Sequence, residues 1–322
     1  MSSPPSGPSF DLQSECHAAA GRIRAHVRHT PTEYSHALSE VSGAEVYLKL
    51  ENLQTTGSFK LRGATNALLS LGPGATGVVA ASSGNHGMAV AHAARSAGLD
   101  ALIFVPEGAA AAKLEAIEAL GAEITRVEGD PVLAETAARR HAGETGLPYL
   151  SPYNDPRVVA GQGTIGVELA SDLDRVDVLF ASVGGGGLIA GAGGYLKGAR
   201  GTRVVACSPV NSAVMHESLL AGRILDLPSF PTLSDGTAGG VEPDAITFDL
   251  CRDIVDDSLT VSEDEIRVAM RMIIGRHHTL IEGSAAVAVA GFLQTTDRWA
   301  GQQVAIVLCG ANVGIGVLKK VL

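Results

Sequence analysis

Aromatic residues are scarce in this chain: they make up 4% of its 322 residues, with a single tryptophan. Hydrophobic residues nonetheless reach 46%, and glycine occurs 39 times. The core must therefore be built from small aliphatic side chains, which suits helices packed closely against strands that are buried on both faces. This amount of apolar material is enough for one large domain or two medium ones.

Positive charge is also in short supply, with 24 Lys and Arg against 34 Asp and Glu and a net charge of −10. A nucleic-acid-binding protein needs a clustered positive field, and no segment supplies one, so a small-molecule partner is favoured. Long apolar runs are missing as well. The stretch 285–293 has about half of the ~20 residues that a membrane-spanning helix needs, so we expect no membrane span.

Cysteines are few and far apart. The four of them, Cys16, Cys207, Cys251 and Cys309, form no CxxC pair of the kind found in metal or redox sites. This usage indicates reduced thiols and a cytoplasmic protein. Residues 1–11 are rich in Ser, Pro and Gly and lack a basic start followed by an apolar run, so we expect a disordered segment rather than a signal peptide or anchor.

Short β-rich runs alternate with alanine-rich segments of helical period along most of the chain. This alternation predicts an α/β protein whose parallel sheets carry helices on both faces. The proline-containing stretch 147–157 is interpreted as a crossing between domains, and 217–259 as an irregular excursion over a site. The strands and helices are expected at 77–81, 87–98, 101–105, 110–121, 123–127, 132–146, 176–183, 188–199, 202–207, 263–277 and 303–308.

Four consecutive glycines, 184–187, stand where an apolar strand ends and a helix begins. They let backbone N–H groups turn inward, and the helix adds its positive end, so a phosphate fits there. Gly185, Gly187 and Ala190 also match a relaxed dinucleotide-binding spacing, but no acidic residue follows until Glu217, beyond the place where ribose would be held. The chain has no Gly-Lys dipeptide, which excludes a P-loop, and a simple tight turn stays open as the alternative.

Two further segments carry polar groups between apolar runs. Lys60 is flanked by Phe59 and Leu61, and such surroundings lower the pKa of an amine toward the nucleophilic range, although a surface lysine is the simpler interpretation. The run 82–87, Ser-Ser-Gly-Asn-His-Gly, offers hydroxyls, an amide and helix N–H groups to a carboxylate. An ordinary helix N-cap is the alternative for this run.

In the order in which they occur along the chain, the motifs resemble those of the fold-type II pyridoxal-phosphate (PLP) enzymes, which are tryptophan synthase β-like. Within these enzymes they resemble the threonine/serine dehydratase and serine racemase group. The resemblance runs from about Ile23 to the C-terminus and implies two parallel-sheet α/β domains with the cofactor in the cleft between them. A large domain of 1–76 and 151–322 is expected, with a small domain of 77–150 inserted. The matching segments are 48–52, 57–60, 82–87, 160–164, 184–187, 235–236, Glu282 and 309–312.

The resemblance also implies a role for each motif. Lys60 forms the covalent link to PLP and is catalytic together with Ser83, which lies on the opposite side of the ring, where racemases use it as a second acid/base. The residues expected to bind the cofactor are Phe59, Lys60, Asn85, Gly184, Gly185, Gly186, Gly187, Leu188, Gly236 and Cys309. The residues expected to bind the substrate carboxylate are Ser82, Ser83, Asn85 and His86.

Cys309 is expected near the pyridine nitrogen, where a thiol leaves the ring largely neutral and favours β-elimination over transamination. The implied activity is a lyase of amino acid catabolism, a dehydratase (ammonia-lyase) that turns a 3-hydroxy amino acid into a 2-oxo acid and ammonia. Threonine, serine, 3-hydroxyaspartate and 3-phenylserine all offer the required atoms. A serine or aspartate racemase is the alternative, and a homodimer is implied for either.

Three positions depart from the family pattern. Ser208 and Val214 stand where serine racemases have metal-binding carboxylates, so no divalent ion is expected, while a monovalent ion such as K⁺ near Ser208 and Glu282 stays open. Ala134 replaces an arginine found in serine racemases, which weakens the racemase interpretation and widens the pocket. His277 and its neighbour at 278 are interpreted as solvated or capping residues. Because the chain ends at residue 322 without the regulatory extension of biosynthetic dehydratases, feedback control is not expected.

Overall fold

The computed structural model describes residues 10–322, so most of the segment expected to be disordered lies outside the described residues. Asp11, at the end of that segment, is ordered as the N-cap of α1 (Leu12–Ile23), where its carboxylate accepts from the backbone N–H groups of Gln13 and Ser14. Within the described chain, we find no helix both long and apolar enough to cross a bilayer.

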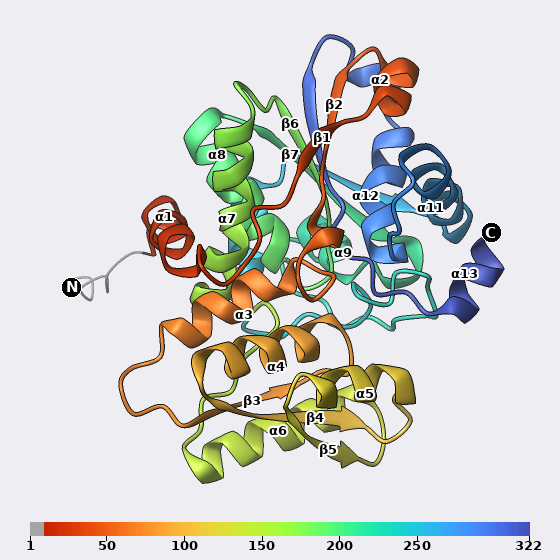
Figure 1. Cartoon of the computed structure of the whole chain (residues 1–322). Helices are drawn as coiled ribbons and strands as arrows, with labels where there is room; N and C mark the ends of the chain where they lie inside the picture. The colour runs from red at the N-terminus through yellow and green to blue at the C-terminus, as the bar shows by residue number, and fades with distance from the viewer. Residues whose placement is uncertain (1–9) are drawn as a thin grey trace.

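The larger of two sheets has the strand order β1-β2-β9-β6-β7-β8 and forms the upper part of the molecule in Figure 1. Helix α12 packs on strands β6 to β9, and α7 and α8 lie on the other side of the sheet (Figure 1). The strands of this sheet are β1 (Thr32–Tyr34), β2 (Glu45–Lys49), β6 (Val178–Ser182), β7 (Arg203–Pro209), β8 (Asp257–Val261) and β9 (Gln303–Val307). The helices and helical turns around it are α1, α2 (His36–Ser42), η1 (Glu51–Leu53), α7 (Pro156–Asp172), η2 (Ile189–Gly193), α8 (Gly194–Arg200), η3 (Val210–Ser212), α9 (Val214–Ala221), α10 (Ile246–Ile254), α11 (Glu263–His277), α12 (Gly283–Leu293), η4 (Thr296–Arg298) and α13 (Ile315–Val321).

Two expectations about this sheet are wrong. Strand β1 pairs antiparallel with β2, although all pairing was expected to be parallel. The connection 35–44 is too short for the crossover that a parallel neighbour requires. The excursion expected at 217–259 is also interrupted, because α9, α10 and β8 leave only 222–245 without helix or strand. Strand β8 is an edge strand with polar side chains, and this composition hid it from the hydrophobic pattern.

The smaller sheet has the order β3-β4-β5, with all strands parallel. Helix α6 contacts β3 and β4 from one side, and α4 contacts them from the other (Figure 1). The apolar core around the smaller sheet extends to Leu61 and Leu68 of α3 and to Val158 of α7. Helix α3 therefore joins the two halves of the molecule. The elements of this part are α3 (Lys60–Leu69), β3 (Gly77–Ala81), α4 (Asn85–Ala97), β4 (Asp100–Pro106), α5 (Ala111–Ala119), β5 (Glu123–Val127) and α6 (Pro131–Thr145).

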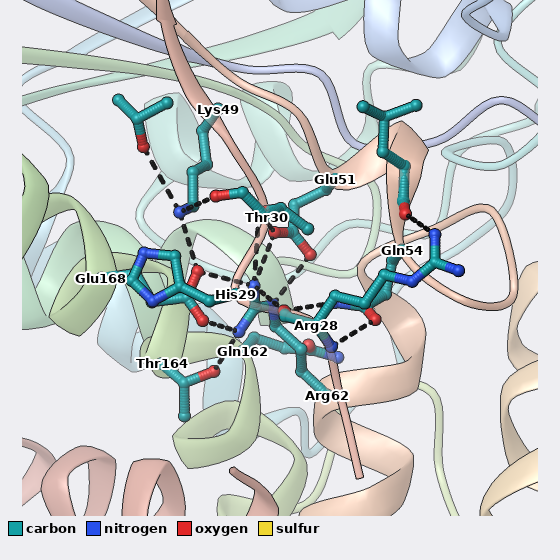
Figure 2. Close-up of polar contacts among 12 residues, drawn as sticks. Arg28, His29, Thr30, Lys49, Glu51, Gln54, Arg62, Gln162, Thr164 and Glu168 are labelled. Carbon is teal, nitrogen blue, oxygen red and sulfur yellow. Dashed lines mark hydrogen bonds and ion pairs between the residues drawn. The ribbon is translucent and has the colours of Figure 1, made fainter. Parts of the chain in front are cut away.

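A cluster of charged side chains is buried where α3, α7, β2 and η1 meet (Figure 2). Arg62 Nη2 lies 2.8 Å from Glu51 Oε1, and its Nη1 lies 2.6 Å from Glu168 Oε1. Lys49 Nζ lies 2.7 Å from Glu168 Oε2 and 3.3 Å from Asp172 Oδ2. Burial alone would raise the pKa of Glu51, but Arg62 and Lys49 outweigh it, so this pKa lies below its usual value. This buried ion cluster fixes α3 two residues away from Lys60.

Candidate active site

A pocket opens at the carboxyl ends of β6 and β9, the edge of a parallel sheet where ligands usually bind. It encloses about 460 Å³ not filled by atoms, including the part that opens to solvent. All ten residues expected to bind the cofactor line it. The lining residues are Phe59, Lys60, Asn85, Tyr153, Ser182, Gly184, Gly185, Gly186, Gly187, Leu188, Gly236, Thr237, Glu282, Ser284 and Cys309.

Lys60 is the first residue of α3 and projects from it into this pocket. The preceding turn is held in place because the backbone N–H of Phe59 donates to the Cys309 carbonyl at 3.1 Å. Lys60 Nζ donates to the Pro152 carbonyl at 3.0 Å and lies 5.3 Å from the centroid of the Phe59 ring. Burial lowers the pKa of Lys60 from 10.5 to about 8, against the opposite influence of Cys309 and Glu282. The amine is therefore much closer to its nucleophilic form than a surface lysine is.

The glycine loop, 184–187, lies in the same pocket. A Cβ at Gly185 would stand 2.2 Å from a ring atom of Tyr153, and one at Gly184 would stand 2.7 Å from the Thr237 carbonyl oxygen. Gly186 has φ +86°, a conformation that side chains disfavour. Thr247 Oγ1 donates to the Gly185 carbonyl at 2.6 Å and fixes the loop from behind. The loop therefore leaves a backbone cradle of the kind that holds a phosphate.

Asn85 belongs to a polar network at the other end of the pocket. Its Nδ2 donates to both carboxylate oxygens of Glu282, at 2.9 and 3.2 Å. Asn312 donates from its Nδ2 to Asn85 Oδ1 at 2.7 Å and from its backbone N–H to Glu282 Oε2 at 3.0 Å. Burial raises the pKa of Glu282 to about 7, so this carboxyl group changes charge near neutral pH. The Asn85 amide, expected to bind the cofactor, is thus held in position by Glu282.

The three remaining carboxylate-binding candidates stand at the turn from β3 to α4 and are not among the lining residues. Ser82 Oγ accepts from the Gly84 N–H at 3.1 Å, while the Ser83 hydroxyl is partly buried. His86 Nε2 lies 2.9 Å from the Leu150 carbonyl oxygen, and burial together with Lys60 lowers its pKa to about 3. The neutral His86 ring is therefore occupied by a backbone contact. This leaves the backbone N–H groups at the N-terminus of α4, rather than the imidazole ring, as the groups available to a carboxylate at this turn.

Ser208 and Glu282, the two residues considered as neighbours of a monovalent ion, have different hydrogen-bond partners. Ser208 Oγ donates to the Val183 carbonyl at 3.2 Å, while Glu282 contacts Asn85 and Asn312 instead. Within residues 10–322, no group of three His, Cys, Asp or Glu side chains is arranged to hold a metal ion. Ala134 is buried within α6 rather than in the pocket lining.

Five pocket residues were not expected from the sequence as cofactor or substrate ligands: Tyr153, Ser182, Thr237, Glu282 and Ser284. Thr237 lies in the stretch 217–259, which was expected to pass over a site, and Glu282 was considered only as an ion neighbour. Tyr153 lies within the stretch interpreted as a domain crossing. Its one sequence signal is that it is an aromatic side chain in a chain with few of them.

An amine of lowered pKa facing a glycine cradle at the carboxyl edge of a parallel sheet fits a cofactor with a carbonyl group and a phosphate, and with this fold it defines a fold-type II PLP enzyme. Residues 23–310 match the family model described as pyridoxal-phosphate dependent enzyme, and the chain belongs to that family.

Individual relatives agree with this assignment. The chain is 41% identical to the L-threonine ammonia-lyase of Thermotoga maritima over 92% of its own length and 74% of that protein. It is 36% identical to the beta-hydroxyaspartate dehydratase of Paracoccus denitrificans, over 94% of this chain and 96% of the other. The structure of maize serine racemase superposes with a TM-score of 0.90 at 31% identity, covering 96% of this chain and 95% of that one. The protein is a PLP-dependent lyase.

Replacing Gly185 by alanine is expected to weaken PLP binding at least about tenfold, because overpacking of this kind costs about 1–3 kcal/mol and displaces the loop or Tyr153. Titration of cofactor-free protein with PLP, followed by absorbance, measures the effect. Gly108→Ala is the matched control, since nothing lies within 4 Å of a Cβ at that position. Equal PLP affinity in both variants would contradict the cradle.

The capture of PLP by cofactor-free protein is expected to accelerate with pH and to level off above about 8. Only the neutral amine attacks an aldehyde, and the pKa of Lys60 is lowered to about 8. Stopped-flow absorbance between about pH 6 and about pH 10 gives the midpoint. In Glu282→Gln the midpoint should fall, because the carboxylate that raises the pKa of Lys60 is removed. A rate that still climbs at pH 10 would show that the amine is not perturbed.

Proposed function

We propose that the protein is a 3-hydroxy amino acid dehydratase (ammonia-lyase) that forms a 2-oxo acid and ammonia. The first candidates for its substrate are amino acids of the threonine and serine type, and the next are the bulkier 3-hydroxyaspartate and 3-phenylserine. The observation that carries the proposal is the Cys309 thiol in the pocket lining, whose pKa burial raises well above its usual value. An uncharged group beside the cofactor ring leaves the ring largely neutral, so negative charge at the substrate Cα is short-lived. Loss of a β-substituent then competes well with slower reactions such as transamination.

Bound PLP supplies an electron sink for negative charge at the Cα of the substrate. Lys60 is placed to accept the Cα proton on its Nζ, and a pKa of about 8 suits an amine that must give up and take up a proton near neutral pH. The substrate carboxylate is proposed to lie on Ser83 and the N-terminus of α4. The 3-hydroxyl group leaves as water, and hydrolysis of the released product gives the 2-oxo acid and ammonia.

A serine or aspartate racemase is the second candidate, because Ser83, at the turn from β3 to α4, offers a hydroxyl group that is proposed as the second acid/base. Racemisation returns the proton to the opposite face of Cα and retains the 3-hydroxyl group. The two candidates therefore differ in products as well as in stereochemistry. A homodimer is proposed for both on the basis of the resemblance alone.

The test is an assay of the PLP-loaded protein against threonine, serine, 3-hydroxyaspartate and 3-phenylserine. The 2-oxo acid and ammonia are measured, and the remaining amino acid is analysed for its chirality. We expect equal amounts of oxo acid and ammonia from at least one of the four. Inversion of the amino acid without any oxo acid would exclude the dehydratase and establish the racemase.

A further inference from the structure

Glu242 lies in the segment 222–245, outside the pocket, and its carboxylate gathers three donors. Arg139 Nη2 lies 2.8 Å from Oε2, and Asn154 Nδ2 donates to the same oxygen at 2.8 Å. Ser151 Oγ donates to Oε1 at 3.2 Å. The Glu242 side chain is 17% exposed and that of Arg139 is 41% exposed, so the contacts are shielded from solvent mainly on the carboxylate side, and its charge strengthens them.

The backbone of Glu242 makes a fourth contact, which reaches the pocket. Its N–H donates to the Tyr153 hydroxyl at 2.9 Å. The Tyr153 ring lies against Gly185, where a Cβ would be 2.2 Å from it, and its own Cβ would be 3.0 Å from a Cβ at Gly187. The preceding residue, Pro152, is the one whose carbonyl accepts from Lys60 Nζ. The segment that Glu242 holds therefore touches both the lysine and the glycine loop.

Arg139 carries the contact to the other half of the molecule. It belongs to α6, which packs on the smaller sheet, and its guanidinium group lies 4.3 Å from the centroid of the Tyr149 ring. Arg139 Nη2 also lies 2.7 Å from Glu135 Oε1 within the same helix. Because Glu135 remains as a partner, neutralising Glu242 does not strand the arginine without a counter-charge.

We propose that Glu242 is a positioning residue that ties α6 to segment 151–154 and thereby presses Tyr153 onto the glycine loop. It touches neither cofactor nor substrate and acts through Tyr153. The proposal deepens the function proposed above, but its main consequence, slower loss of PLP, holds whichever amino acid is the substrate. The function and the positioning role can therefore fail independently.

The experiment compares the rate at which the holoenzyme loses PLP to excess hydroxylamine in wild type and in Glu242→Gln. The amide keeps the shape and loses the charge, and loss of the charge-assisted bonds is expected to speed PLP release about tenfold. Asp257→Asn is the matched control. Asp257 also pairs with an arginine at 2.8 Å and is 22% exposed, but it stands at the start of β8, away from the pocket.

Two more variants separate positioning from a general loss of stability. Tyr153→Phe removes only the hydroxyl group that accepts from the Glu242 N–H, and like Glu242→Gln it should speed PLP release. Arg139→Gln is measured alone and combined with Glu242→Gln. The double variant should release PLP no faster than Glu242→Gln alone, because both changes break the same Arg139–Glu242 contact. The proposal would be overturned if Glu242→Gln lost PLP at the same rate as Asp257→Asn. It would also be overturned if the acceleration of PLP release in the double variant equalled the product of the accelerations in Arg139→Gln and Glu242→Gln.

Discussion

Alanine in place of Lys60 is expected to abolish the visible absorbance of bound PLP and to lower turnover by at least about three orders of magnitude. Lys60 Nζ is the amine that faces the glycine loop in the pocket, and it has the lowered pKa that a covalent link to an aldehyde requires. The same nitrogen is proposed to take the Cα proton. One substitution therefore removes both the anchor of the cofactor and the base.

Borohydride reduction followed by peptide mass analysis locates the covalent link directly. Wild type should carry reduced cofactor on the peptide that contains Lys60, and Lys60→Ala should carry none. Lys197→Ala is the control, because Lys197 is a partly buried lysine paired with Asp256 and lies outside the pocket lining. Cofactor fixed to a different lysine in wild type would disprove the assignment, whatever the activities are.

Methionine in place of Arg62 is expected to lower the free energy of unfolding by about 3–5 kcal/mol, the usual cost of removing one partner from a buried ion pair. The side chains of both Arg62 and Glu51 are 0% exposed, so the remaining carboxylate has no water to replace the guanidinium group. The loss should also loosen the start of α3 and weaken PLP binding. Chemical unfolding of the holoenzyme measures the first effect, and PLP titration measures the second.

The direction in which the stability loss of Arg62→Met changes with pH tests whether the charge of Glu51 causes that loss. In wild type, Arg62 holds the pKa of Glu51 below 4.5, so this pair contributes stability above that pH and loses it as the pH falls further. In Arg62→Met the unpaired Glu51 has a raised pKa, so the deficit relative to wild type should shrink as the pH falls toward 4.5. Adding Glu51→Gln should recover part of the lost stability at neutral pH. A deficit that does not change with pH or with the second substitution would contradict the charge argument.

Local patterns predicted the elements that carry the site. The strands at 77–81 and 123–127 and the helix at 263–277 have the expected bounds, because each combines a clear hydrophobic period with glycine or capping residues at its ends. The glycine loop was predictable for the same reason: a strand, a glycine turn and a helix follow one another directly in the sequence.

Contacts between distant segments were not predictable in this way. The position of Tyr153 on the glycine loop depends on how segment 151–154 packs against 222–245, which carries Glu242. The pKa of Glu282 depends on burial, which raises it, and on groups from four separate parts of the chain, Asn85, Lys113, Asp235 and Asn312. No periodicity records such neighbours, because they are set by chain segments that meet only after folding.

The sequence by itself determined the α/β class, the strands of both sheets apart from β1, β2 and β8, the PLP family, and the lysine and glycine motifs. These features depend on residue types at short spacings. The tertiary structure alone decided how Lys60 acquires its lowered pKa, how Asn85 is held by Glu282, and which side chains fix the two halves around the pocket. The physical reason is that desolvation and charge pairing depend on the complete surroundings of a group, which form only when both sheets pack against α3.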